Sequence, residues 1–345
     1  KKYKNNIFKV LPSFQYFTKL IGELNFPINY QKWYLFLLVT LLGTTSWAQT
    51  NNALNFDGAS GVMADLDYVS IPHNNLLNIN GGDFTLEAWV FPTDGTSETI
   101  MSKGVNSGGA NQDIFIFQIN GNKILLQLGK TSGSSENGFS TTDIPLNQWS
   151  HVAVTYNSGT MTVTFYLNGV ADGTHTYSGT LYNGDTNPAS IGRQGFTGGC
   201  NCNPFDGSID EVRVWDDVRT QKEISLNMNN PLTGSEANLV AYYPFNEGVA
   251  NGNNTALTTV FDRTANNLDG TLTQMMLSGA TSNFVAGFTG VNNALSFDGA
   301  DDFVNITSPF TGFTNAITVE TWINLNTLTS AEGVAGQSTA NVNDL

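Results

Sequence analysis

The chain has 345 residues, of which 40% are apolar and 12% charged, and 35 are glycine. This length suits one large domain or two smaller ones, and the composition is typical of an all-β protein with many turns. Without residues 1–48 the chain keeps 8 basic and 28 acidic residues, a net charge of −20. Such an acidic surface repels phosphate backbones, which excludes nucleic acid as a partner.

Residues 1–48 are predicted to be a secretory signal peptide with an upstream extension. Lys32 precedes the apolar run 33–42, and small residues lead from it to a cleavage point after Ala48. The alternative is a membrane anchor, but a helix that crosses a bilayer needs about 20 apolar residues. We therefore expect a secreted or cell-surface protein that does not span the membrane.

An internal repeat organises the rest of the chain. Residues 53–58, Ala-Leu-Asn-Phe-Asp-Gly, recur at 294–299 as Ala-Leu-Ser-Phe-Asp-Gly, and the motif Glu-x-Trp of the first copy also recurs in the second. Repeats this far apart indicate tandem domains rather than a solenoid, whose periods run about 20 to 50 residues. We expect one complete domain at residues 49–234 and a second, truncated at its C-terminus, at 238–345.

The first copy shows the period-two pattern of strands. At 84–91 alternation places Phe84, Leu86, Ala88 and Val90 on one face. Turn sequences predict hairpins at 120–122, 157–160 and 168–169, and further strands are expected at 189–192 and 207–215.

One short helix is predicted at 220–228, because Thr220 and Glu223 form a capping box that would satisfy free amides at the helix start. About a dozen short strands and one helix favour a two-sheet antiparallel jelly-roll β-sandwich.

Several motifs occur in order: Phe-Asp-Gly at 56–58, Phe-Thr-Leu-Glu-Ala-Trp-Val at 84–90, Trp-Ser-His-Val-Ala-Val-Thr-Tyr at 149–156, and Phe-Asp-Gly-Ser-Ile-Asp-Glu-Val-Arg-Val-Trp at 205–215. Together they resemble the bacterial laminin-G-like jelly-roll domain of the concanavalin A-like lectin/glucanase superfamily. Leu-Val-Ala-Tyr-Tyr-Pro-Phe-Asn-Glu-Gly at 239–248 resembles the usual opening of such a domain, and for this reason the second domain is placed from 238.

The resemblance implies sugar binding, adhesion or glucan hydrolysis, and the acidic residues argue against hydrolysis. Glucanases of the superfamily carry clustered carboxylates on one strand, whereas Glu87 stands alone and Asp210 and Glu211 are adjacent. We expect Glu87 to be a buried acid paired with Arg213 or a main-chain amide, and His151 to be a packing residue. No catalytic residue is therefore assigned.

Loop aromatics are the candidates for ligand binding. Tyr182, Phe196 and Phe205 lie in connections rich in Gly and Asn, where an exposed ring could stack on a sugar. The alternative for each of them is a ring that anchors its loop to the core.

The resemblance also suggests a structural calcium ion, with Asp57 and Asp210 as carboxylate ligands. Alternation places Asp210 on the same face as two core valines of its strand, where a carboxylate needs compensation. The alternative is that both acids cap turns. Cys200 and Cys202 are a possible local disulfide.

Two functions remain open at this stage. The first is a binding or adhesion module for a polysaccharide, a surface glycan or a protein, without catalysis of its own. The second is an accessory part of a larger exported glycoside hydrolase or protease.

Overall fold

The computed structural model describes residues 51–58, 66–107, 110–195, 203–279 and 283–289. Residues 1–291 form one compact unit and 292–345 another. The predicted signal peptide and the second copy of the repeat lie outside the described residues. The following account therefore concerns the first unit.

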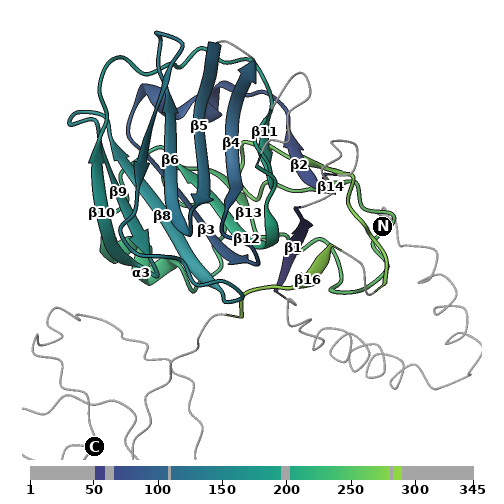
Figure 1. The fold of residues 1–345 in the computed structure, drawn as a ribbon. Coiled ribbons are helices and arrows are strands. Elements are labelled where there is room, and N and C mark those ends of the chain that lie inside the picture. The colour runs from purple at the N-terminus through teal and green to yellow at the C-terminus, as the bar shows by residue number, and fades with distance from the viewer. Residues whose placement is uncertain (1–50, 59–65, 108–109, 196–202, 280–282, 290–345) are drawn as a thin grey trace, which may run out of the picture. The chain divides into compact units, whose positions relative to one another are not determined.

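Two antiparallel sheets pack face to face, as predicted for a jelly-roll sandwich (Figure 1). We call the first of them sheet A. Its central strands β8, β3 and β12 are joined to β9 and β10 on one side and to β1 and β16 on the other, while β13 pairs with the second half of β12. In spatial order its strands are β10 (Val170–Thr176), β9 (Thr162–Leu167), β8 (Ser150–Asn157), β3 (Phe84–Pro92), β12 (Asp206–Trp215), β1 (Asn52–Asp57) and β16 (Phe284–Ala286), with β13 (Leu239–Tyr243) beside β12.

Sheet B lies on the other side of the core and includes the long hairpin β4–β5. In spatial order its strands are β14 (Thr259–Val260), β15 (Gly270–Thr273), β2 (Tyr68–Ile71), β11 (Ala189–Ile191), β4 (Ser97–Ser107), β5 (Ala110–Asn120), β6 (Lys123–Gly129) and β7 (Ser135–Phe139).

The core between the sheets follows the alternation read from the sequence. Phe84, Leu86, Ala88 and Val90 all lie in it with at most 1% of their surface exposed. Burial of a side chain of this size contributes about 1.5–3 kcal/mol, so this strand alone supplies a substantial part of the apolar stabilisation.

The predicted hairpins and the helix cap are confirmed. The turns at 120–122, 157–160 and 168–169 connect β5 to β6, β8 to β9 and β9 to β10. Helix α3 (Gln221–Asn227) begins with the capping box, in which the Thr220 hydroxyl accepts from the Glu223 amide and the Thr220 amide donates to the Glu223 carboxylate.

The two sheets extend past the predicted boundary at residues 234–238. We call residues 239–289 the closing segment. It supplies β13, β14, β15 and β16 to the two sheets of the first unit, which extends to Val291. The motif at 239–248 resembles the opening of a domain and so predicts a strand of the second copy. Its strands pair instead with the sheets of the first unit, and a sequence motif alone does not determine which sheet a strand joins.

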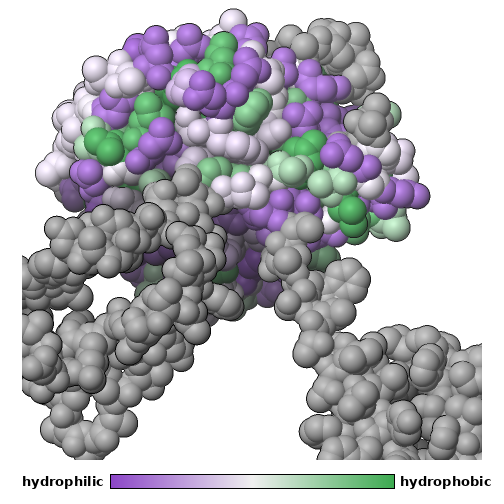
Figure 2. Space-filling model, turned by 90° about the horizontal axis from the view of Figure 1, so that it is seen from below, coloured by the Kyte–Doolittle hydropathy of each residue, from purple (hydrophilic) through white to green (hydrophobic). Residues whose placement is uncertain are grey.

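The surface of the unit carries its hydrophobic residues in small patches. Seen from below, green residues are separated by hydrophilic ones over the described part of that face (Figure 2). Large apolar side chains that are more than half exposed occur singly, at Val170, Leu226, Val249 and Met276. Among the described residues no helix has the length and apolar character to cross a membrane.

Candidate functional site

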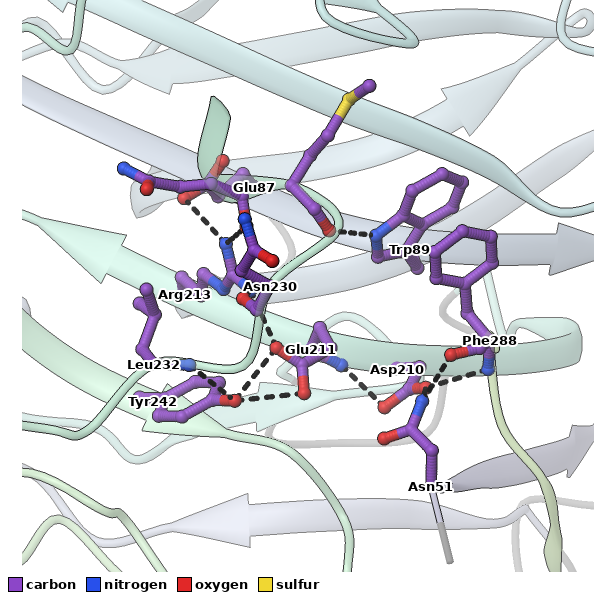
Figure 3. Close-up of polar contacts among 12 residues, drawn as sticks. Asn51, Glu87, Trp89, Asp210, Glu211, Arg213, Asn230, Leu232, Tyr242 and Phe288 are labelled. Atoms are coloured by element: carbon purple, nitrogen blue, oxygen red, sulfur yellow. Dashed lines mark hydrogen bonds and ion pairs between the residues drawn. The ribbon is translucent and has the colours of Figure 1, made fainter. Parts of the chain in front are cut away.

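A network of charged side chains lies on the outer face of sheet A, away from the core (Figure 3). Glu87 Oε1 accepts a hydrogen bond of 2.8 Å from Trp215 Nε1 and lies 3.7 Å from Arg213 Nη1. His151 Nε2 lies 3.3 Å from the other Glu87 oxygen. The predicted pairing of Glu87 with Arg213 is therefore present, and His151 is buried beside it.

Arg213 extends this network to a second carboxylate. Its Nη2 donates to Glu211 Oε2 at 2.7 Å, and the Tyr242 hydroxyl lies 2.8 and 2.9 Å from the two Glu211 oxygens. The loop after helix α3 covers the group, because the carbonyls of Asn227 and Asn230 accept from the Arg213 guanidinium.

Burial by itself would raise the pKa of Glu87, but the contact with His151 and the charge of Arg213 outweigh it and lower that pKa to about 2. Glu87 and Arg213 are each at most 2% exposed. Because a ligand cannot reach them, this network holds strands together and is not a site of recognition.

Asp210 lies on the opposite face from the one predicted. A β-bulge between Asp210 and Arg213, with Glu211 at φ 52°, adds one residue to β12. Asp210 therefore pairs with Trp89 on the outer face, while Val212 still faces the core. The prediction assumed that side chains alternate between the two faces of the sheet along the whole strand. The extra residue in the bulge shifts this alternation by one, so the residues before it point to the opposite face.

The Asp210 carboxylate is fully buried and is compensated by N–H donors. The Glu211 amide, the Phe288 amide and Asn51 Nδ2 donate to it at 2.8, 2.9 and 3.0 Å. Burial and the charge of Glu211 nevertheless hold the pKa of Asp210 well above its usual range.

The structure does not bring Asp57 and Asp210 together. Asp57 pairs with Asp206, four residues before Asp210 on β12. At about 3.3 Å per residue, the two acids lie about 13 Å apart along the strands, whereas calcium ligands lie about 2.3–2.6 Å from the ion. These two carboxylates do not fit one calcium site, and the described residues contain no other group of three metal-ligating side chains.

The three aromatic candidates have different outcomes. Phe205 is fully buried, with its ring edge-on to Phe56 at 6.3 Å, so the expectation of an exposed ring is wrong there. Its loop joins the core because the Phe205 amide donates to the Gly192 carbonyl. Phe196 lies outside the described residues, as do Cys200 and Cys202. Tyr182 alone remains as a described, half-buried ring.

Tyr182 lies in the loop between β10 and β11, at one end of sheet B. Its amide donates to the Gly129 carbonyl at the end of β6, at 2.9 Å. Asn80 Nδ2 donates to the Tyr182 carbonyl at 3.1 Å and also to the carbonyl of Ile114 on β5. The main chain at Tyr182 is thus held to β6 directly and to β5 through Asn80, and the ring packs in part against the core.

A buried ion pair also connects this loop to sheet B. Lys103 on β4 and Asp185 are both at most 2% exposed, and Lys103 Nζ bonds to Asp185 Oδ2. Lys103 also donates to the Asn187 carbonyl at 2.5 Å and lies 3.3 Å from His73 Nδ1. A buried lysine satisfied by several partners holds this loop against the sheet.

Asp113 lies at the same end of sheet B. Its backbone packs against Gly129, whose carbonyl accepts from the Tyr182 amide. Gln127 Nε2 donates to Asp113 Oδ2 at 3.1 Å.

Asp113 is 1% exposed, and this burial raises its pKa to about 6 against the opposing hydrogen bonds of Gln194 and Gln127. At this exposure a ligand cannot reach the Asp113 carboxylate, as it cannot reach Glu87. Asp113 therefore supports the site by holding the Gln127 carboxamide.

We call Tyr182, Asp113 and Gln127 the sheet B site. It combines a half-buried ring with a half-buried carboxamide, which the buried Asp113 carboxylate holds in place. Sequence reasoning identified Tyr182 from its loop but missed Asp113, because a lone Asp at the start of an apolar strand gives no signal until the fold places it beside the loop.

Comparison with known families supports the fold of this unit. Residues 64–225 match the family model of the concanavalin A-like lectin/glucanases superfamily. The match supports a laminin-G-like jelly roll. It ends before β13, so the closing segment lies outside the part of the laminin-G-like sandwich that the family model covers.

Solved structures show limited similarity to the chain. A protein from Bacteroides ovatus ATCC 8483, described as a candidate carbohydrate binding protein, is 25% identical with a TM-score of 0.46, over 65% of this chain and 58% of its own. A SAP-like pentraxin from Limulus polyphemus is 20% identical with a TM-score of 0.39, over 51% of this chain and 81% of its own.

The CBM40 domain of a Ruminococcus gnavus IT-sialidase, bound to α2,3 sialyllactose, is 18% identical with a TM-score of 0.37, over 42% of this chain and 82% of its own. Similarity at this level does not transfer a function. No curated protein matches the chain.

Proposed function

We propose that the chain is an exported binding module that recognises a neutral polysaccharide at the sheet B site, without catalysis of its own. The observation that carries the proposal is the half-buried ring of Tyr182, in a loop whose main chain is held at the end of sheet B where the half-buried carboxamide of Gln127 lies. The superfamily of the matching family model includes lectins, which agrees with this reading.

The chemistry of the site suits a sugar. An aromatic ring stacks on the C–H face of a pyranose, and carboxylate and carboxamide groups bind its hydroxyls. Gln127 both donates and accepts, so its half-buried carboxamide can bind a sugar hydroxyl, while its bond to the buried Asp113 holds it in place. The anchored loop lowers the entropic cost of binding, because its main chain is already ordered.

Charge favours a neutral ligand. Residues 49–345 carry a net charge of −20. The lysines nearest the site are already paired, Lys103 with Asp185 and Lys130 with Glu136 at 2.6 Å. Anionic sugars need a free cation to offset their charge, and the acidic surface repels them.

A panel of polysaccharides tests the proposal. Neutral glucans, mannans, xylans and arabinans are compared with pectate, alginate and heparin by affinity electrophoresis at two salt concentrations. We expect retardation by at least one neutral polymer and none by the anionic ones. Retardation by anionic polymers alone, or by none of the panel, would contradict the proposal.

A further inference from the structure

The closing segment completes a sandwich whose other strands precede it in the sequence. Its strands β13, β15 and β16 pair with β12, β2 and β1. Tyr243, Phe245 and Phe284 of this segment are fully buried in the core. The sandwich therefore has an acceptor edge, formed by β1 and β2, which is filled by a donor located after the helix.

Specific polar contacts hold the donor at this edge. Asn52 Nδ2 donates to the Gly248 carbonyl at 2.7 Å, and the Asn55 amide donates to the Asn283 carbonyl at 2.7 Å. Asn283 Nδ2 in turn donates to Asp67 Oδ2 at 2.6 Å. The acceptor side of the contact thus consists of Asn52, Asn55 and Asp67.

The sequence repeats this acceptor. Asn52 corresponds to Asn293 and Asp67 to Asp302, and both residue types are kept. Asn55 corresponds to Ser296, but here the contact uses the main chain, which any residue supplies. A chain that carries both donor and acceptor can satisfy the same contacts with another copy of itself.

The connection to the donor permits such an exchange. Residues 229–238 join the end of helix α3 to β13 along the surface, where Pro231, Thr233 and Ala237 are exposed. When chains refold together, the donor and the rest of the sandwich can therefore come from different molecules, because the exposed connection can run from one molecule to the other. The cost is the burial of Tyr243, Phe245 and Phe284, which a second copy restores.

We propose that the closing segment is exchangeable, and that a second copy of this chain is its partner. The β16 strand of one molecule then pairs with β1 of the other, with the same register and the same core side chains as within one molecule. Two chains joined in this way exchange segments reciprocally and form a closed pair.

Cysteines placed across the β1–β16 pair test this proposal in the full chain. Ala53 and Val285 are directly opposite in the register, and Cα atoms of opposite residues lie about 4.5–5.5 Å apart, within the range of about 4.4–6.8 Å that a disulfide spans. The variant A53C/V285C is made in a C200S/C202S background, in two forms with tags of different size. The two forms are mixed, refolded at low and high protein concentration, oxidised and separated on a non-reducing gel.

We expect crosslinked monomer at low concentration and, at high concentration, a disulfide-linked dimer that contains both tags. The control T99C/Q118C bridges β4 and β5, which lie within the matched region, and should stay monomeric throughout. A crosslink that remains intrachain at every concentration would overturn the proposal. So would an equal amount of dimer in the control, because it would show non-specific association.

Discussion

Glu87 and Arg213 are paired across β3 and β12, and the bulge in β12 begins immediately before this pair. The bulge lets Glu211 and Glu87 both approach the one guanidinium, at 2.7 and 3.7 Å. Two carboxylates and one arginine are thus buried together, and each depends on the others for compensation.

The variant Glu87→Gln is expected to lower the free energy of unfolding by about 3 kcal/mol, because loss of one member of a buried ion pair leaves its partner uncompensated. Urea unfolding followed by circular dichroism measures this. Asp143→Asn is the matched control, since Asp143 is exposed, its partner Lys123 is half-buried at the surface, and such pairs contribute about 0–1 kcal/mol. Equal effects of the two variants would contradict the account.

Glu87 also predicts a loss of stability in acid. Its pKa is lowered to about 2 in the folded protein, so its contribution is complete above its unfolded pKa and is lost as the pH falls toward 2. The melting temperature of the natural protein should therefore fall between pH 4.5 and 2, and Glu87→Gln should reduce this slope. An unchanged slope in the variant would count against the assignment.

The pKa shift of Glu98 is in the opposite direction from that of Glu87, so its effect on stability with pH is also opposite. Burial, followed by the charges of Asp94 and Asp206, raises its pKa to about 9. The folded protein then holds a proton that the unfolded chain releases, so stability falls as the pH rises from about 5 to 9. The variant Glu98→Gln should melt several degrees higher than the natural protein at pH 8 and equally at pH 5. A lower melting temperature at pH 8 would show that the charged form is stabilised.

The extent of the sandwich predicts the outcome of truncation. Residues 49–291 should unfold cooperatively, whereas residues 49–237 should not, because they lack the buried Tyr243, Phe245 and Phe284. Loss of one such ring costs about 3–5 kcal/mol, and a whole domain is stable by about 5–15 kcal/mol. A cooperative melt of the shorter piece would contradict this expectation and support a first domain that ends at residue 234.

Calcium is tested by melting with the ion and then with chelator. Since Asp57 and Asp210 do not share a site, the two curves should superimpose, and Asp210→Asn should lower both equally through its hydrogen bonds with Asn51, Glu211 and Phe288. A rise in melting temperature with calcium that disappears in Asp210→Asn would indicate that Asp210 binds the ion.

The sequence predicts local features of this fold better than its long-range ones. Alternation at 84–91 and the capping box at Thr220 depend on neighbouring residues, and both are found. The face of Asp210 depends on a bulge at Glu211, a residue type that carries no signal for positive φ. Asp113 meets Gln127 only through the pairing of β5 with β6, which brings residues separated in sequence to one end of the sheet.

The central claim, that a neutral glycan binds at the sheet B site, is tested most directly by replacing Tyr182. The variant Tyr182→Ala is compared with the control Phe261→Ala. Phe261 is a ring of 46% exposure that is not part of the sheet B site. Affinity for the retained polysaccharide is measured by calorimetric titration, with the melting temperature as a check on folding. Loss of a stacked ring should weaken binding about tenfold in Tyr182→Ala, and Phe261→Ala should bind like the natural protein. Equal affinity of all three proteins would contradict the claim.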